Sequence, residues 1–107
     1  MFGVVPKPLW SQRLVPDDRN RIDLQMWCLL VETPNETLLI ETGFGGKVSD
    51  RLREIYGLWE EPGLMTALRQ AGKGAGDVDR VILTHLHQDH AGGTTVREGE
   101  GFAPAFE

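Results

Sequence analysis

The residues that could do chemistry are concentrated in the run His85-Leu86-His87-Gln88-Asp89-His90, which holds all three histidines of this 107-residue chain. His85 and His87 are two positions apart, and on a strand two such side chains point to the same face. Imidazole is a good ligand for zinc, and Asp89 and His90 follow at once. The run therefore predicts a metal site in preference to a solvated loop that happens to contain histidines.

A second metal ion is predicted beside the first. Ala91-Gly92-Gly93 allows the backbone to turn sharply, and that turn can direct Asp89 and His90 at a second point. Two metal ions about 3.5–4 Å apart can hold a hydroxide between them and stabilise a developing oxyanion. The spacing excludes the helical His-Glu-x-x-His zinc site. A single cysteine, Cys28, excludes a zinc finger, and its apolar surroundings predict a small buried side chain, not a nucleophile.

Hydrophobic periodicity predicts the strands that must position this run. Strands are expected over residues 21–32, 37–41 and 79–84, the last leading directly into His85. In the first of them the apolar pattern covers both faces from residue 27 onwards, so Trp27 is expected to pack in the core.

Two helices are expected between the second and third strands. Ser49 is a suitable N-cap for a helix through Tyr56, and a second helix is expected to start near Pro62 and to stop at Gly72. The inner face of the first helix is predicted to comprise Leu52, Ile55 and Tyr56. The order strand, strand, helix, helix, strand predicts an α/β fold, and no further element is expected after Gly93.

Composition limits the classes of function. The net charge is −5, from 11 basic and 16 acidic residues, which does not favour a nucleic-acid partner. No segment has the roughly 20 apolar residues of a membrane helix, and no signal peptide is recognisable, so we expect a cytoplasmic protein that acts on a small molecule. The oligomeric state is left open. We expect an irregular arm over residues 1–20 and a single domain over 21–107.

Once the spacing is considered as a whole, Thr84-His85-Leu86-His87-Gln88-Asp89-His90-Ala91-Gly92-Gly93 resembles the signature of the metallo-β-lactamase fold superfamily. Leu39-Ile40-Glu41-Thr42-Gly43 resembles its strand-end segment, which usually has Asp where this chain has Glu41. The resemblance covers residues 21–93 and implies the N-terminal half of an αβ/βα sandwich.

The resemblance also implies roles for the run. His85 and His87 resemble ligands of the first metal, and Asp89 and His90 resemble ligands of the second, with Asp89 as the catalytic residue. Two zinc ions per complete domain are implied, with iron or manganese as alternatives. The further ligands of the family lie downstream of its motif, whereas no residue after Gly93 is His or Asp. We therefore expect an incomplete domain that carries the first half of the site and is inactive alone.

The activity implied is hydrolysis, in which a hydroxide held by two metal ions attacks an ester, a lactone or a phosphoester. The short segment Gly3-Val4-Val5-Pro6-Lys7 resembles a lactonase-like branch of the family. Two alternatives stay open: an iron-dependent redox enzyme on the same scaffold, such as a thiol dioxygenase or a diiron oxygen reductase, and a non-catalytic metal- or partner-binding fragment.

Three further residues have two interpretations each. Glu41 either braces the metal loop through a hydrogen bond or is a strand-end carboxylate in solvent. Phe44 and Trp59 either line a substrate entrance or pack in the core.

Overall fold

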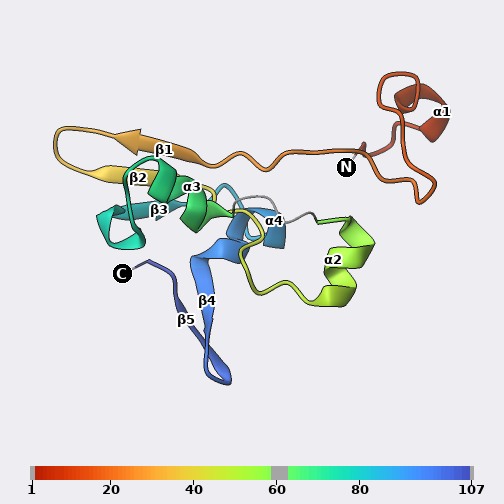
Figure 1. The fold of residues 1–107 in the computed structure, drawn as a ribbon. Helices are drawn as coiled ribbons and strands as arrows, with labels where there is room; N and C mark the ends of the chain where they lie inside the picture. The colour runs from red at the N-terminus through yellow and green to blue at the C-terminus, as the bar shows by residue number, and fades with distance from the viewer. Residues whose placement is uncertain (1, 59–62, 107) are drawn as a thin grey trace.

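A computed structural model describes residues 2–58 and 63–106 of the chain (Figure 1). The predicted helix start at Pro62 and the residue Trp59 lie outside these residues. The elements, in chain order, are α1 (Lys7–Trp10), β1 (Leu29–Glu32), β2 (Thr37–Ile40), α2 (Asp50–Tyr56), α3 (Leu64–Gln70), η1 (Ala75–Asp77), β3 (Arg80–Ile82), α4 (Gln88–Ala91), η2 (Gly92–Thr94), β4 (Thr95–Glu98) and β5 (Gly101–Pro104).

The main sheet has the strand order β1-β2-β3. β1 and β2 are antiparallel, with Leu30 opposite Leu39. Their turn is closed by Thr33, whose hydroxyl oxygen accepts a hydrogen bond from the backbone N–H of Glu36 at 3.0 Å. β3 returns parallel to β2, with Val81 opposite Leu39, after a crossover that contains α2 and α3. The mixed sheet and its helical crossover confirm the predicted α/β class.

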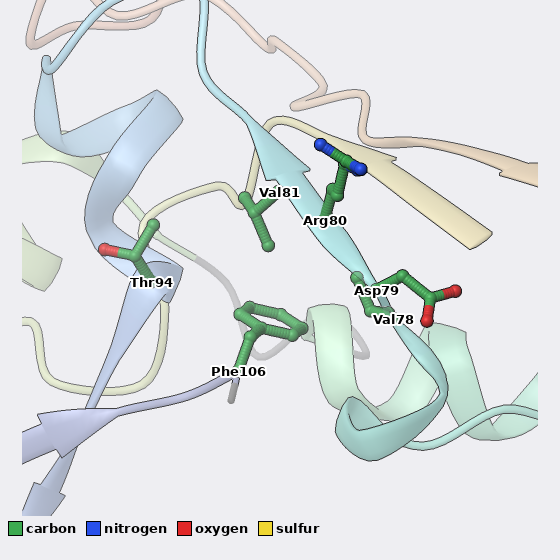
Figure 2. Close-up of a pocket in the computed structure, with 6 residues that line it drawn as sticks. All are labelled: Val78, Asp79, Arg80, Val81, Thr94 and Phe106. Atoms are coloured by element: carbon green, nitrogen blue, oxygen red, sulfur yellow. The ribbon is translucent and has the colours of Figure 1, made fainter. Parts of the chain in front are cut away.

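The core lies between the sheet and α3, around the buried side chains of Leu39, Leu68 and Val78. The ring of Phe106 points toward Val81 and Val78 on the same side of β3 (Figure 2). A cavity of about 230 Å³ remains beside this ring.

Cys28 packs against this core, and burial raises the pKa of its thiol. A raised thiol pKa disfavours the reactive thiolate, which agrees with the prediction of a small apolar side chain.

The predicted start of the first helix is confirmed. The Ser49 hydroxyl oxygen accepts a hydrogen bond from the backbone N–H of Leu52 at 3.4 Å, and Gly57 ends α2 with φ 63°. The predicted burial of its inner face is wrong, because Ile55 is 53% exposed and Tyr56 is 50% exposed. α2 lies beside the body of the molecule instead of covering the sheet (Figure 1), so periodicity identified the helix without identifying what it contacts.

The first predicted strand is largely wrong, since only Leu29–Glu32 of residues 21–32 pairs in the sheet. Residues 21–28 run extended toward the arm (Figure 1) and pair with no strand in the described chain. Trp27, predicted to be in the core, is 81% exposed. Apolar alternation shows that a segment can form a strand, but the hydrogen bonds of a sheet also need a neighbouring strand.

The expectation of no element after Gly93 is also wrong. β4 and β5 form an antiparallel hairpin with Val96 opposite Ala103, and it projects from the body (Figure 1). Gly99 supplies the positive φ, 56°, that a tight hairpin turn requires. The guanidinium of Arg97 lies over the ring of Phe102, 5.4 Å from its centroid.

No helix within residues 2–58 and 63–106 is long and apolar enough to cross a membrane.

We expect the 107-residue chain to have low stability as an isolated monomer. Its radius of gyration is 16.1 Å, against about 13 Å for an ordinary domain of this length, and among the described residues three hydrophobic side chains form the buried core. Thermal unfolding followed by circular dichroism should give a broad transition centred below about 45 °C. A sharp transition of the monomer above that temperature would contradict this expectation.

Candidate metal site

The three imidazoles of the histidine run gather at one place beyond the end of β3. The ring centroid of His85 is 4.7 Å from that of His87 and 4.0 Å from that of His90. Asp89 joins them, with Oδ2 at 3.5 Å from Nε2 of His90. The predicted clustering of these four side chains is confirmed, while their role as metal ligands stays a prediction.

The way in which the chain brings them together differs from the prediction. β3 ends at Ile82, so His85 and His87 lie on an irregular segment and not on a strand. β3 is short because its neighbour β2 ends at Ile40. Beyond that residue the backbone of β2 turns away and offers β3 no further partner. The single turn of α4 then carries His90 back over His87, with the N–H of His90 donating to the His87 carbonyl oxygen at 2.9 Å.

Thr42 joins the end of β2 to this helical turn. Its backbone N–H and its hydroxyl both donate to the carbonyl oxygen of His90, each at 2.8 Å. The hydroxyl oxygen also accepts a hydrogen bond from the N–H of Gly93 at 3.1 Å. Thr42 is 1% exposed, and hydrogen bonds in such a buried environment hold the backbone of His90 firmly.

The glycines after the run allow two backbones to approach closely. A Cβ atom at Gly92 would overlap the carbonyl group of Phe44, and one at Gly93 would overlap that of Thr42. Gly92 has an ordinary helical φ of −60°. The prediction that this glycine allows a sharp backbone turn is therefore wrong. The absence of a side chain is what the contact requires.

Glu41 braces the run from beneath. Its Oε1 accepts a hydrogen bond from the backbone N–H of Thr84 at 2.9 Å, and its Oε2 lies 3.0 Å from Nδ1 of His90. The angle of that second contact is not that of a hydrogen bond, and Oε2 makes none with the described residues. The residue is 9% exposed, so the interpretation as a carboxylate in solvent is wrong.

The electrostatics of Glu41 suit that role. Hydrogen bonding from Thr84 lowers the pKa of its carboxyl group, burial acts in the opposite direction, and His90 adds to the lowering. The carboxylate is therefore ionised at neutral pH and can orient a neighbouring imidazole. Glu41 has a left-handed φ of 67°, which turns the chain out of β2 and brings its side chain under the run.

The contacts at Nδ1 decide which ring nitrogens remain available. Nδ1 of His90 faces Glu41, and Nδ1 of His85 is 3.0 Å from the hydroxyl oxygen of Thr84. In His85 this leaves Nε2 for a ligand, whereas Nε2 of His90 also faces a carboxylate, with Oδ2 of Asp89 at 3.5 Å.

The donor set fits zinc in chemical type, since imidazoles and one carboxylate are its usual oxygen and nitrogen ligands. Within residues 2–58 and 63–106, however, no group of three His, Cys, Asp or Glu side chains is arranged to hold one ion. The rings of His85, His87 and His90 instead lie against one another. Rotation of these side chains is needed before three donor atoms can meet at one point.

A groove of about 270 Å³ lies beside the run. Gln88 and Gly92 form the side nearest the histidines, and Phe44, Leu52 and Phe102 contribute apolar walls. Phe44 is half-buried there and contacts Tyr56, with ring centroids 5.6 Å apart. This placement agrees better with Phe44 at a substrate entrance than with Phe44 in the core.

Sequence reasoning missed two residues of this region. Thr42 follows a strand end, which was a usable signal because strand ends often carry functional side chains. Lys47 had no such signal: its ammonium donates to the carbonyl oxygens of Gly92 and Thr95 and ties the loop after β2 to the start of β4.

The chain is similar in sequence and in fold to known proteins. The sequence model described as Metallo-beta-lactamase superfamily matches residues 21–96. An N-acyl homoserine lactonase of Bacillus cereus is 31% identical over 69% of this chain and 34% of its own length. The N-acyl homoserine lactonase AiiB of Agrobacterium fabrum is 33% identical over 85% of this chain and 34% of its own length.

Two solved structures are also similar. A probable metal-dependent hydrolase from Staphylococcus aureus has a TM-score of 0.81 and 38% identity, over 91% of this chain and 35% of the other. AidC, a dizinc quorum-quenching lactonase, has a TM-score of 0.51 and 32% identity, over 65% of this chain and 21% of the other. The chain thus spans about a third of the length of the curated relatives it matches.

We expect Gly93→Ala to separate the helical turn from the end of β2, because the added methyl group overlaps Thr42. Overpacking costs about 1–3 kcal/mol, so hydrogen exchange of the Thr42 amide should accelerate about tenfold or more relative to that of Leu39. Gly46→Ala is the matched control, because its new methyl group would meet no atom within 4 Å. Equal exchange rates in the two variants would contradict the close-contact role.

Proposed function

We propose, from the premise that this chain belongs to the metallo-beta-lactamase superfamily, that it carries the first part of a dinuclear zinc site that hydrolyses a lactone. The observation that supports this most is the gathering of three imidazoles and Asp89 over a buried carboxylate. His85 and His87 are assigned to the first ion, and Asp89 and His90 to the second.

Each of these side chains has a defined task in the proposed reaction. His85 presents Nε2, because its Nδ1 lies against Thr84. Nδ1 of His90 faces Glu41, and its Nε2 lies toward Asp89, the other ligand assigned to the second ion. Asp89, which is partly exposed, holds the attacking water by a hydrogen bond and accepts its proton. When bound, a pair of zinc ions lowers the pKa of water toward neutrality and polarises the carbonyl group under attack.

A lactone is favoured over a phosphoester because the relatives that match this chain are named N-acyl homoserine lactonases. Zinc is favoured over iron because one similar structure is described as a dizinc enzyme. The redox alternative on the same scaffold predicts iron in the purified protein, so elemental analysis separates the two. The non-catalytic alternative predicts bound metal without turnover.

The activity is tested with the product of the complete open reading frame that encodes residues 1–107. We expect zinc-dependent opening of N-acyl homoserine lactones, followed as acid release in a pH-stat, and a loss of at least about a thousandfold in kcat/KM in Asp89→Asn. Absence of lactone turnover by the zinc-loaded protein would overturn the proposed substrate.

Zinc binding by the 107-residue polypeptide itself should be weak. A catalytic zinc normally has three protein ligands, whereas each proposed ion here has two, and the rings must rotate to meet it. Titration with zinc by calorimetry should give dissociation constants above about 1 μM, and His87→Ala should weaken binding further. Leu86→Ala is the matched control, because its side chain is 81% exposed and is not a ligand. Tight binding of two ions per chain would contradict the expected weakness.

We expect Glu41→Gln to weaken zinc binding in the product of the complete reading frame. Removing a carboxylate that orients a ligating histidine lowers metal affinity about 10–100-fold, and an amide cannot attract Nδ1–H of His90 as strongly. Competition with a chromogenic chelator measures the affinity. Glu98→Gln, which removes an exposed carboxylate from β4, should leave it unchanged, and an equal loss in both variants would rule out a specific role for Glu41.

A further inference from the structure

The side chain of Arg21 connects the arm to α2. On the arm side, Asp17 closes a compact turn: its Oδ1 accepts hydrogen bonds from the backbone N–H groups of Arg19 at 2.9 Å and Arg21 at 2.8 Å. Its Oδ2 accepts from Nε of Arg21, also at 2.8 Å. The turn therefore holds the guanidinium group of Arg21 in one orientation.

The other side of the same guanidinium group faces the C-terminal end of α2. Nη1 of Arg21 donates to the carbonyl oxygen of Glu54 at 3.0 Å, where the helix dipole favours a positive charge. Arg19 adds an ion pair with the Glu54 side chain at 3.4 Å. Gly57 makes room for this approach, because a Cβ atom there would lie 2.7 Å from Nη1 of Arg21.

α2 in turn forms part of the groove beside the histidine run. Ser49 and Leu52, at its N-terminal end, line the groove together with Gln88. Tyr56, in its last turn, contacts Phe44, whose ring is another wall. α2 is not covered by the sheet (Figure 1), so the core does little to determine its position, and the contact with Arg21 is one of the interactions that can.

We propose that Arg21 is a positioning residue: by joining the Asp17 turn to the C-terminal end of α2, it sets the α2 wall of the groove next to the histidine run. The effect on substrate rests on the proposed hydrolase function, whereas the joint itself does not. Arginine is required because its planar fork reaches Asp17 and the Glu54 carbonyl oxygen at once, and a lysine ammonium cannot bridge both.

The first experiment is hydrogen exchange on the product of the complete reading frame with Arg21→Lys, which keeps the charge. Losing a charge-assisted hydrogen bond should accelerate exchange of the Gly57 and Leu58 amides about tenfold, while amides of β2 keep their rates. Arg51→Lys, an exposed arginine of the same helix, is the control and should change neither. Unchanged exchange rates of the α2 amides in Arg21→Lys, or an equal acceleration in β2, would show that Arg21 does not hold α2 in place.

The second experiment measures lactone hydrolysis by the product of the complete reading frame. Arg21→Lys should raise KM about threefold or more without changing kcat, because the groove wall moves while the reacting groups do not. Asp17→Asn should give the same pattern. An unchanged KM despite faster α2 exchange would overturn the positioning role. Absence of turnover in the unmodified enzyme would instead overturn the proposed function, and the exchange rates would still decide whether the joint exists.

Discussion

The site depends on one contact, that between the backbone leaving β2 and the helical turn that carries His90. Thr42 donates twice to the carbonyl oxygen of His90, and Gly93 donates back to the Thr42 hydroxyl oxygen. These residues are about fifty positions apart in the chain, and the two backbones approach so closely that no side chain fits at Gly92 or Gly93. Without this contact α4 would be a single, unsupported helical turn, too short to persist alone.

The sheet places this contact where it is needed. β2 and β3 are parallel neighbours, so their C-terminal ends lie side by side and the segments that follow them meet. Glu41 leaves one end and Thr84 leaves the other, and the hydrogen bond between them continues the pairing beyond the last ladder residue. The histidine run is thus attached to the sheet on both sides, through Thr84 before it and through Thr42 after it.

Glu41 stands where the resemblance noted in the sequence implies Asp. The longer side chain spans from a backbone N–H to an imidazole while its own backbone adopts a left-handed φ. That conformation is unfavourable for a residue with a Cβ atom, and the surrounding hydrogen bonds offset it. The residue connects the sheet to the histidine run, because one carboxylate oxygen accepts from Thr84 and the other lies 3.0 Å from Nδ1 of His90.

Much of the candidate site could be predicted from the sequence because its candidate ligands are close together in the chain. His85, His87, Asp89 and His90 lie within six positions, so a strand end and one helical turn are enough to gather them. The N-cap Ser49 and the short strand Thr37–Ile40 were predicted for the same reason, since both are local signals. The likeness to a family added the expected activity, which no local pattern contains.

The rest needed the tertiary structure, because it depends on what each segment meets. The alternation at residues 21–28 has no strand to pair with in the described part of the chain, and Trp27 is therefore exposed although its neighbours are apolar. Glu41 had two interpretations until the fold placed Thr84 and His90 against its two oxygens. The sequence by itself determined which side chains are candidate metal ligands, whereas the tertiary structure alone decided which carboxylate lies against them, because hydrogen bonds between distant segments leave no periodic pattern in the chain.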